Sequence, residues 1–295
     1  VQLTMQAMGI SLYEWVKDLF DADLFAEDAR VISFTSEDRL ESTADAQQQE
    51  GLLHLAGRSW PLDPGSGTGN GASGPCQIDV ACSAADAWQP QSRATVLLVI
   101  AGTTLCSGTL VNNARQDDRP LILTANHCVV TDANVGSTLA YFNVHRSACG
   151  SGAYGSLMQN LRGKSLLTRA RTGIGADHAL FELVDKPPAN FDAYYAGYDI
   201  SGAVPTSGAG THHPAGDDKK FSRFTAPAST ASDVCIGSSC GLLGDGFRIN
   251  AWSVVWAAGA TEGGSSGSAL WNPDGRLVGV LSGGHAQCVA AGVNN

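Results

Sequence analysis

The hydrophobic and polar positions of this chain change their spacing near residue 71. From there to residue 295, short apolar runs with period-two alternation are separated by turn-forming residues, a pattern that predicts many short strands. Strands are expected in ATVLLVIAG, SGTLVNN, PLILTANHC, DHALFELV, FRINAWSVVWA, SALWN and RLVGVLSGG. Because no regular helical spacing interrupts these runs, the pattern favours an antiparallel barrel or sandwich.

Residues 1–70 show a different pattern. Apolar residues recur at roughly helical spacing over residues 5–25, which predicts an amphipathic helix, and RVISFTS (30–36) predicts a strand. PLDPGSGTGNGASGP (61–75) is rich in turn formers and predicts a linker. We therefore expect a small α/β segment over residues 1–70 and a separate, mostly β domain over residues 71–295.

Charge and cysteine content change at the same boundary. Residues 1–70 hold 12 acidic and 4 basic side chains, whereas residues 71–295 hold 16 and 14, so most of the formal charge of −10 belongs to the first segment. All eight cysteines follow residue 70, and no two of them form a CxxC pair. An even number of cysteines without that spacing favours disulfides over zinc, and disulfides indicate an oxidising compartment.

Composition also argues against several kinds of partner. No apolar run approaches the roughly 20 residues that span a bilayer, and no basic patch indicates nucleic acid, so neither membrane nor nucleic acid is expected as a partner. The N-terminus lacks the basic and apolar pattern of a signal peptide, so a signal peptide is expected to precede Val1. His212 and His213 beside Asp217 and Asp218 raise the alternative of a metal site, but we expect neither a metal nor a cofactor.

Three stretches together hold the residue types of a nucleophilic enzyme. His127 ends an apolar run, Asp177 lies on the apolar face of an alternating run, and TEGGSSGSALW (261–271) holds three serines among glycines. Each stretch alone has a structural explanation: a core histidine, an exposed acid at a strand start, or a flexible loop. In combination they supply a hydroxyl, a base that takes its proton, a carboxylate that orients the base, and backbone N–H groups for an oxyanion.

Residues 76–288 resemble the chymotrypsin-fold serine endopeptidases, and among them the secreted bacterial lysyl endopeptidase branch of the Achromobacter protease I type. The resemblance rests on CSGTLVNN with LTANHC, on DHALFEL, and on TEGGSSGSALWN followed by RLVGVLSGG, in the family's order of His, Asp and Ser. GASGPCQIDVAC resembles the start of the mature enzyme in that branch, and HHPAGDDKKFS resembles one of its loops. The resemblance implies two six-stranded antiparallel barrels, with His127 and Asp177 on the first and Ser266 on the second.

The resemblance also assigns roles within the serine-rich loop. The family's G-x-S-G pattern matches residues 264–267, which makes Ser266 the nucleophile and the N–H groups of Gly264 and Ser266 the oxyanion hole. Ser265 takes the place of an aspartate that pairs with the newly cut N-terminus in the trypsin group. Because serine cannot form that ion pair, activation by that route is not expected.

A substrate-binding strand is implied beyond this loop. Ser282, Gly283 and Gly284 would pair with the substrate backbone, and Ser282 would also donate a hydrogen bond to Asp177. The lysyl branch has histidine at the Ser282 position, so the chain departs here toward the general trypsin-like pattern.

Disulfide pairing follows from the resemblance as well, because eight cysteines allow 105 pairings from sequence alone. The implied pairs are Cys76–Cys288, Cys82–Cys149, Cys106–Cys128 and, as the remaining two cysteines, Cys235–Cys240. The closing strand and C-terminal helix of the family are missing before Asn295. We therefore expect the second barrel to be incomplete and the sequence to be truncated at both ends.

The acid that would select a basic substrate residue is not found. The trypsin group places it where this chain has Ala260, and the lysyl branch places it after the last cysteine, beyond Asn295. Glu262 is the only acid in the serine-rich loop, and it is expected to be an exposed loop acid, with a role in the specificity pocket as the alternative.

The resulting hypothesis is a secreted, monomeric serine endopeptidase that cuts proteins or peptides after Lys through an acyl-enzyme. The alternatives are a catalytically inactive binding or adhesion module, and a glutamyl-type or esterase-like hydrolase on the same fold. Residues 1–70 are expected to be a propeptide removed near Asn70–Gly71. Because the nearest upstream basic residue is Arg58, that removal would need another protease, or a cut at Arg58 with later trimming.

Overall fold

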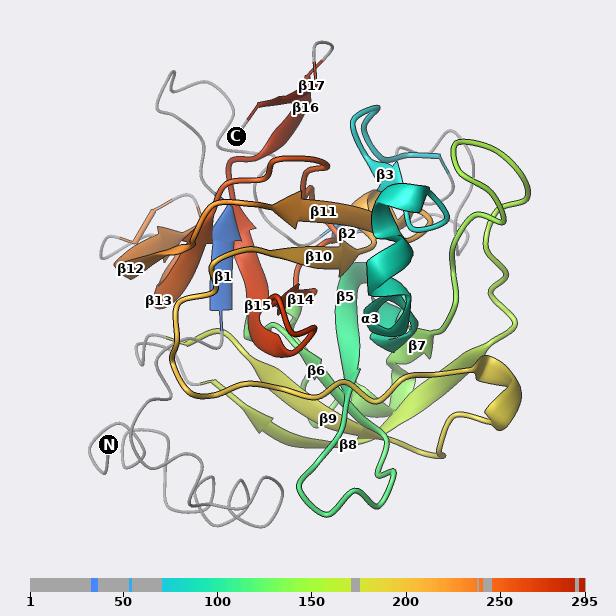
Figure 1. Cartoon of the computed structure of the whole chain (residues 1–295). Coiled ribbons are helices and arrows are strands. Elements are labelled where there is room, and N and C mark those ends of the chain that lie inside the picture. The colour runs from blue at the N-terminus through green and yellow to red at the C-terminus, as the bar shows by residue number, and fades with distance from the viewer. Residues whose placement is uncertain are drawn as a thin grey trace.

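Two large sheets of short strands and a two-stranded hairpin hold the strands of the described part of the chain (Figure 1). The computed structural model describes residues 33–36, 53–54, 71–170, 176–237, 239–240, 246–289 and 292–294. The helix expected over residues 5–25 and the linker up to residue 70 lie outside these ranges. Every strand expected in residues 71–295 is present, and the strand expected over 30–36 is present as Ser33–Ser36.

The first sheet closes into a six-stranded antiparallel barrel. Its strands are β4 (Thr95–Ile100), β5 (Thr104–Val111), β6 (Leu121–Thr124), β7 (Leu139–Tyr141), β8 (Asn160–Arg169) and β9 (Ala179–Leu183). They follow the order β5-β4-β7-β8-β9-β6, and β6 returns to pair with β5. A short strand, β2 (Leu53–His54), adds to the other end of β5. The closed antiparallel barrel expected for the first half of the domain is thus confirmed.

The position of β4 explains why its sequence is apolar without interruption. Val96, Leu98 and Ile100 point into the barrel core, whereas Leu97 and Val99 join a second apolar cluster on the other face. A strand that is buried on both faces has no solvent side to carry polar residues. The run TVLLVI therefore follows from its position rather than from a helix or a membrane span.

The second sheet has eight strands in an open order, in agreement with the expected incomplete barrel. Its strands are β3 (Ile78–Asp79), β10 (Gly208–His212), β11 (Lys220–Phe224), β12 (Ser229–Ile236), β13 (Phe247–Val254), β14 (Ala269–Trp271), β15 (Leu277–Gly284) and β1 (Ser33–Ser36). The order is β12-β13-β1-β15-β14-β10-β11-β3. Strand β1 runs parallel to both neighbours, so this N-terminal strand occupies the position between β13 and β15 (Figure 1).

Short helices and one hairpin lie between and after the strands of the two large sheets. The α-helix α3 (Gln89–Ala94) leads into β4, and β16 (Gln287–Val289) and β17 (Gly292–Asn294) form a hairpin after β15. The 3-10 helices are η2 (Ser83–Trp88), η3 (Asn126–Cys128), η4 (Val135–Ser137), η5 (Ala189–Phe191) and η6 (Pro214–Gly216). No helix in the described ranges has both the length and the apolar character needed to cross a bilayer.

A shared apolar core joins the two sheets. Its buried members include Val111, Leu121 and Leu180 from the first barrel and Ala209, Phe221 and Trp271 from the second sheet. Because residues from both sheets fill one core, loops at its edge are held at a fixed separation. The candidate site lies on such loops.

Four disulfides add covalent links, and they are the four pairs that the family resemblance implied. The structure joins Cys76–Cys288, Cys82–Cys149, Cys106–Cys128 and Cys235–Cys240. The Cys106–Cys128 bridge connects β5 to η3, the short helix that carries His127.

We expect the Cys106–Cys128 bridge to stabilise the fold more than the Cys235–Cys240 bridge. Their sequence separations are 22 and 5 residues, and a longer closed loop removes more entropy from the unfolded chain. Replacing both cysteines by serine should cost about 3 kcal/mol at the first bridge and about 2 kcal/mol at the second. Urea unfolding of the two double variants measures this, and a larger loss at Cys235–Cys240 would contradict it.

Three buried histidines are kept neutral by the fold. Burial lowers the pKa of His178 to about 4, with Asp177 opposing this change, and lowers the pKa of His212 to about 3, assisted by Lys220. Burial also moves the pKa of His213 well below its ordinary value.

These histidines predict a loss of stability in weak acid. As pH falls through 6.5 the unfolded chain binds protons that these folded histidines do not accept, so the unfolded state becomes favoured. The free energy of unfolding should fall by about 1 kcal/mol per histidine between pH values of about 6.5 and 5.5. His178→Phe should reduce this decrease by about one histidine's share, and urea titrations at both pH values test it. A stability that does not change across this interval would contradict the prediction.

Candidate active site

Strand pairing in the first barrel brings His127 and Asp177 together. Strands β6 and β9 are antiparallel with Thr124 opposite Ala179, so the end of β6 lies beside the start of β9. His127 follows β6 in η3, and Asp177 precedes β9 by two residues. The His127 Nδ1 atom lies 2.6 Å from Asp177 Oδ2, and the His127 backbone N–H donates to Oδ1 at 2.9 Å.

The environment of Asp177 keeps this buried acid ionised. Burial favours the neutral form and would raise its pKa, but the electrostatic attraction of His127 and the hydrogen bonds from His127 outweigh burial, so the pKa is lowered. The Ser282 hydroxyl also lowers it, although this hydroxyl makes no hydrogen bond of standard geometry. The hydrogen bond expected from Ser282 to Asp177 is therefore not formed with standard geometry in the described part of the chain.

The pairing determines the tautomer of His127. A carboxylate only accepts hydrogen bonds, so Nδ1 carries the proton and Nε2 is left as a basic nitrogen. Among the described residues the Nε2 atom has no hydrogen-bond partner, and the side chain is about 10% exposed. The Phe247 ring stacks on the imidazole with centroids 5.8 Å apart, a contact that no sequence motif indicated.

The serine-rich loop of the second sheet is attached to the first barrel through Ser107 of β5. The Ser107 N–H donates to the Ser266 carbonyl at 2.8 Å, and its hydroxyl donates to the Gly264 carbonyl at 3.0 Å. The Sγ atom of Cys128, the residue after His127, lies 3.9 Å from the Ser266 carbonyl oxygen. These contacts bring Ser266 to the same region as the His127–Asp177 pair.

The backbone geometry at residue 267 explains why a glycine follows Ser266, the candidate nucleophile. Its φ of +80° is one that side-chain-bearing residues rarely adopt, and a Cβ would lie 2.3 Å from Thr124 Oγ1 and 2.5 Å from the Ser107 carbonyl oxygen. Only a residue without a side chain lets the loop approach β5 and β6 this closely.

Two backbone N–H groups of the loop have no acceptor among the described residues. The N–H groups of Ser265, Gly267 and Ser268 donate to carbonyls within the loop or on β15. The N–H groups of Gly264 and Ser266, which the sequence comparison assigned to an oxyanion hole, make no such bond. Free donors at these two positions suit an anionic oxygen.

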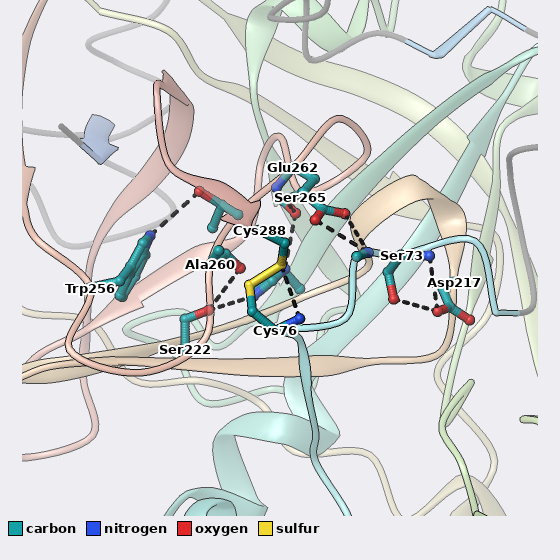
Figure 2. The surroundings of a disulfide bond; sticks show 12 residues. Ser73, Cys76, Asp217, Ser222, Trp256, Ala260, Glu262, Ser265 and Cys288 are labelled. Carbon is teal, nitrogen blue, oxygen red and sulfur yellow. Dashed lines mark hydrogen bonds between the residues drawn. A yellow bond between two sulfur atoms is a disulfide. The ribbon is translucent and has the colours of Figure 1, made fainter. Parts of the chain in front are cut away.

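Ser265 begins a buried hydrogen-bonded chain that the sequence did not reveal. The Glu262 N–H donates to Ser265 Oγ at 3.2 Å, and Ser265 Oγ lies 2.9 Å from His212 Nδ1. The His212 Nε2 atom lies 2.9 Å from Ser222 Oγ, which donates to the Ala260 carbonyl at 2.9 Å (Figure 2). This order gives every member a donor and an acceptor only when His212 is neutral with its proton on Nε2.

The residues considered for a metal site have separate roles. His212 belongs to the chain just described, His213 Nδ1 contacts the Asp217 carbonyl, and the Asp217 carboxylate accepts N–H groups from residues 71–73. No cluster of three or more His, Cys, Asp or Glu side chains within the described ranges could hold a metal ion.

The remaining candidate residues are placed as follows. Gly283 and Gly284 lie at the end of β15 and are partly exposed, and Ser282 before them is buried. Ala260 is buried. Glu262 is half-buried and accepts the Gly74 N–H at 3.1 Å, so it is less exposed than the sequence indicated.

Comparison with known proteins assigns this arrangement to a family. The family model described as "Lysyl endopeptidase, C-terminal domain" matches residues 70–295. A lysyl endopeptidase of Pseudomonas aeruginosa is 29% identical over 239 residues, which cover 75% of this chain and 48% of the relative, so the chain spans about half the length of that protein.

Two solved structures share part of the backbone arrangement. A thermostable serine protease from an extremophilic microorganism has a TM-score of 0.43 and 14% identity, and covers 69% of this chain and 90% of its own. A protease from M. tuberculosis in its active form has a TM-score of 0.43 and 13% identity, and covers 76% and 82%. Since the family model covers well over half of the chain, the protein belongs to the lysyl endopeptidase C-terminal domain family.

Proposed function

We propose that residues 71–295 form the catalytic domain of a secreted serine endopeptidase that uses Ser266, His127 and Asp177. The observation that carries this proposal is the buried His127–Asp177 pair, with Nε2 of His127 unpaired and the Ser266 loop bonded to the same barrel. Family membership supports the same reaction class.

Acylation follows from the groups in place. His127 Nε2 takes the Ser266 hydroxyl proton as Oγ attacks the carbonyl carbon of the scissile peptide bond, and Asp177 stabilises the resulting imidazolium. The N–H groups of Gly264 and Ser266 bind the oxyanion. The imidazolium then gives its proton to the departing amine, which leaves an ester on Ser266.

Deacylation repeats these steps with water. His127 takes a proton from a water molecule that attacks the ester carbonyl, the same N–H groups bind the second oxyanion, and the proton returns to Ser266 as the acid product leaves. The substrate backbone would lie along residues 282–284, whose two glycines leave room for an added strand.

Cleavage after Lys is the specificity that the family supports, as the Pseudomonas relative is a lysyl endopeptidase. Neither Ala260, which is buried and uncharged, nor Glu262, which binds Gly74, supplies the acid that such a pocket requires. We therefore propose that the acid lies outside the described loop. A glutamyl-type or esterase-like hydrolase is the alternative within the enzyme class, and an inactive binding or adhesion module is the alternative outside it.

We further propose that residues 1–70 are a propeptide and that the enzyme is secreted and acts on proteins or peptides as a monomer. The start of the family match at residue 70 supports this boundary, and so does the exposure of Gly71. Four disulfides support an oxidising destination.

Ser266→Ala should abolish peptide hydrolysis, with a loss of roughly 10⁴-fold or more in kcat, because no other hydroxyl can form the acyl-enzyme. Ser268→Ala is the matched control: Ser268 is equally buried in the same loop, and its hydroxyl has no hydrogen-bond partner. Initial rates on a peptide mixture and labelling by a fluorophosphonate distinguish the two variants. Inactivity of Ser268→Ala with an active Ser266→Ala would refute the assignment.

Cleavage-site profiling of the full-length protein on a peptide mixture should find Lys before the cut bond. The physical reason is that a buried acid in the pocket rejects neutral and acidic side chains, which leave its charge unpaired. Cuts mainly after Glu would support the glutamyl alternative, and no cuts with no labelling of Ser266 would support an inactive module.

A further inference from the structure

The segment 71–74 is held by two carboxylates from different loops. The Gly71 N–H donates to Asp217 Oδ1 at 2.6 Å. The Ser73 hydroxyl donates to Asp217 Oδ2 at 2.5 Å (Figure 2). The next contact is with the serine-rich loop, where the Gly74 N–H donates to both oxygens of Glu262 at 3.1 and 3.2 Å. The Cys76–Cys288 disulfide then ties this segment to the chain beyond β15.

Asp217 is a buried acid whose surroundings lack one positive charge. Only about 1% of Asp217 is exposed, and the nearest cation, Lys220 Nζ, lies 3.6 Å away. That ammonium is closer to a second buried acid, Asp79, at 2.5 Å. The third acid of the cluster, Asp218, has Arg146 Nε at 3.8 Å. Three carboxylates thus share two cations, and every contact of the Asp217 carboxylate shorter than the one to Lys220 comes from a neutral N–H or O–H donor. A buried carboxylate without a close cation of its own is costly.

The turn that carries Asp217 also supports the nucleophile loop. Within η6 (Pro214–Gly216), the Ala215 N–H donates to the Gly263 carbonyl at 2.5 Å. A Cβ on Gly264 would lie 2.8 Å from the His213 carbonyl oxygen and 3.0 Å from the Gly216 nitrogen, so the turn lies directly against an oxyanion donor. A displacement of Asp217 would therefore move the support of Gly264.

Glu262 connects the same segment to the other side of the loop. Its N–H donates to Ser265 Oγ and its carbonyl accepts the Ser265 N–H at 2.9 Å. The turn before Asp217 thus contacts Gly263, and Glu262 contacts Ser265. Both contacted residues are chain neighbours of the proposed oxyanion donors.

We propose that Asp217 is the receptor for a free α-amino group at Gly71, and that cleavage of the Asn70–Gly71 bond thereby completes the oxyanion loop. Hydrolysis adds water across that bond and converts the Gly71 amide into an ammonium with three donors and one positive charge. This is the charge that the buried cluster lacks. The inference rests on the proposed function. In the trypsin group the acid of the activating ion pair stands where this chain has Ser265, whereas here the acid would be Asp217, on a different loop.

Gly71 is shaped for this position. A Cβ at this position would lie 2.9 Å from Tyr154 Oη, so a residue with a side chain would not fit without movement. Since Gly71 is itself exposed, the nitrogen reaches the buried carboxylate from the surface, where a protease has access.

The test uses the full chain with a recognition site for a sequence-specific protease replacing residues 66–70, so that cleavage leaves Gly71 as the first residue. A second version carries one extra Ala before Gly71, which displaces the new ammonium by one residue. Asp217→Asn removes the receptor charge, and Glu262→Gln is the matched control, because the amide that Glu262 binds is unchanged by cleavage. The readouts are the rate of fluorophosphonate labelling of Ser266 and hydrogen exchange of residues 213–217 and 262–266, before and after cleavage.

Cleavage should raise the labelling rate of the Gly71 form by about tenfold or more and slow exchange in both loops. The Ala-extended form and Asp217→Asn should gain less than about twofold, whereas Glu262→Gln should keep most of the gain. Equal gains in the Gly71 and Ala-extended forms would overturn the inference, and this comparison holds even if Asp217→Asn does not fold. Labelling of Ser266 that is unchanged by cleavage overturns the inference and leaves the proposed function intact.

Absence of labelling in every form overturns the proposed function. Hydrogen exchange that is the same before and after cleavage overturns the inference independently of the labelling result.

Discussion

Three hydrogen bonds between Ser107 and loops of the second sheet hold the candidate site together, because they link its two halves directly. Ser107 lies on β5 of the first barrel, where its N–H and hydroxyl bind the carbonyls of Ser266 and Gly264, and its Oγ accepts the His213 N–H at 3.0 Å. Its neighbour Cys106 is bonded to Cys128, next to His127. One strand thus positions His127 through a disulfide to the next residue and the Ser266 loop through hydrogen bonds.

A second requirement is that the buried polar side chains beneath the loop of Ser266 all have hydrogen-bond partners. Buried polar groups without partners cost free energy, and here Ser265, His212 and Ser222 form a chain that ends on the Ala260 carbonyl. Where the trypsin-like pattern has a carboxylate in this loop, the chain has a neutral hydroxyl and a neutral histidine. The charged contacts lie at the outer edge of the loop, on Asp217 and Glu262, where residues 71–74 cross it.

Much of this molecule follows from local sequence patterns. Alternation and turn residues predicted the strands from β4 to β6, β9 and β13 to β15, because a strand with one buried face must alternate and a strand buried on both faces must be apolar. Residue types and strand pattern singled out His127 and Asp177 as candidates, and these lie at the ends of two paired strands. The family resemblance pointed to Ser266, which lies in a loop where glycine geometry is required. Strands β7, β8 and β10 to β12 lack a strong period, since many of their positions are neither fully apolar nor regularly alternating.

What the sequence by itself determined is therefore the strand-rich fold class and, through family resemblance, the disulfide pairs, while it proposed the residues of the candidate triad. Only the tertiary structure decided which distant residues meet: Ser107 with Ser266, His212 with Ser265, Phe247 with His127, and Asp217 with Gly71, which is 146 residues away. The parallel pairing of β1 with β13 and β15 was likewise decided only by the tertiary structure. The physical reason is that periodicity records whether a side chain faces solvent or core, whereas hydrogen bonds between loops depend on how two sheets pack.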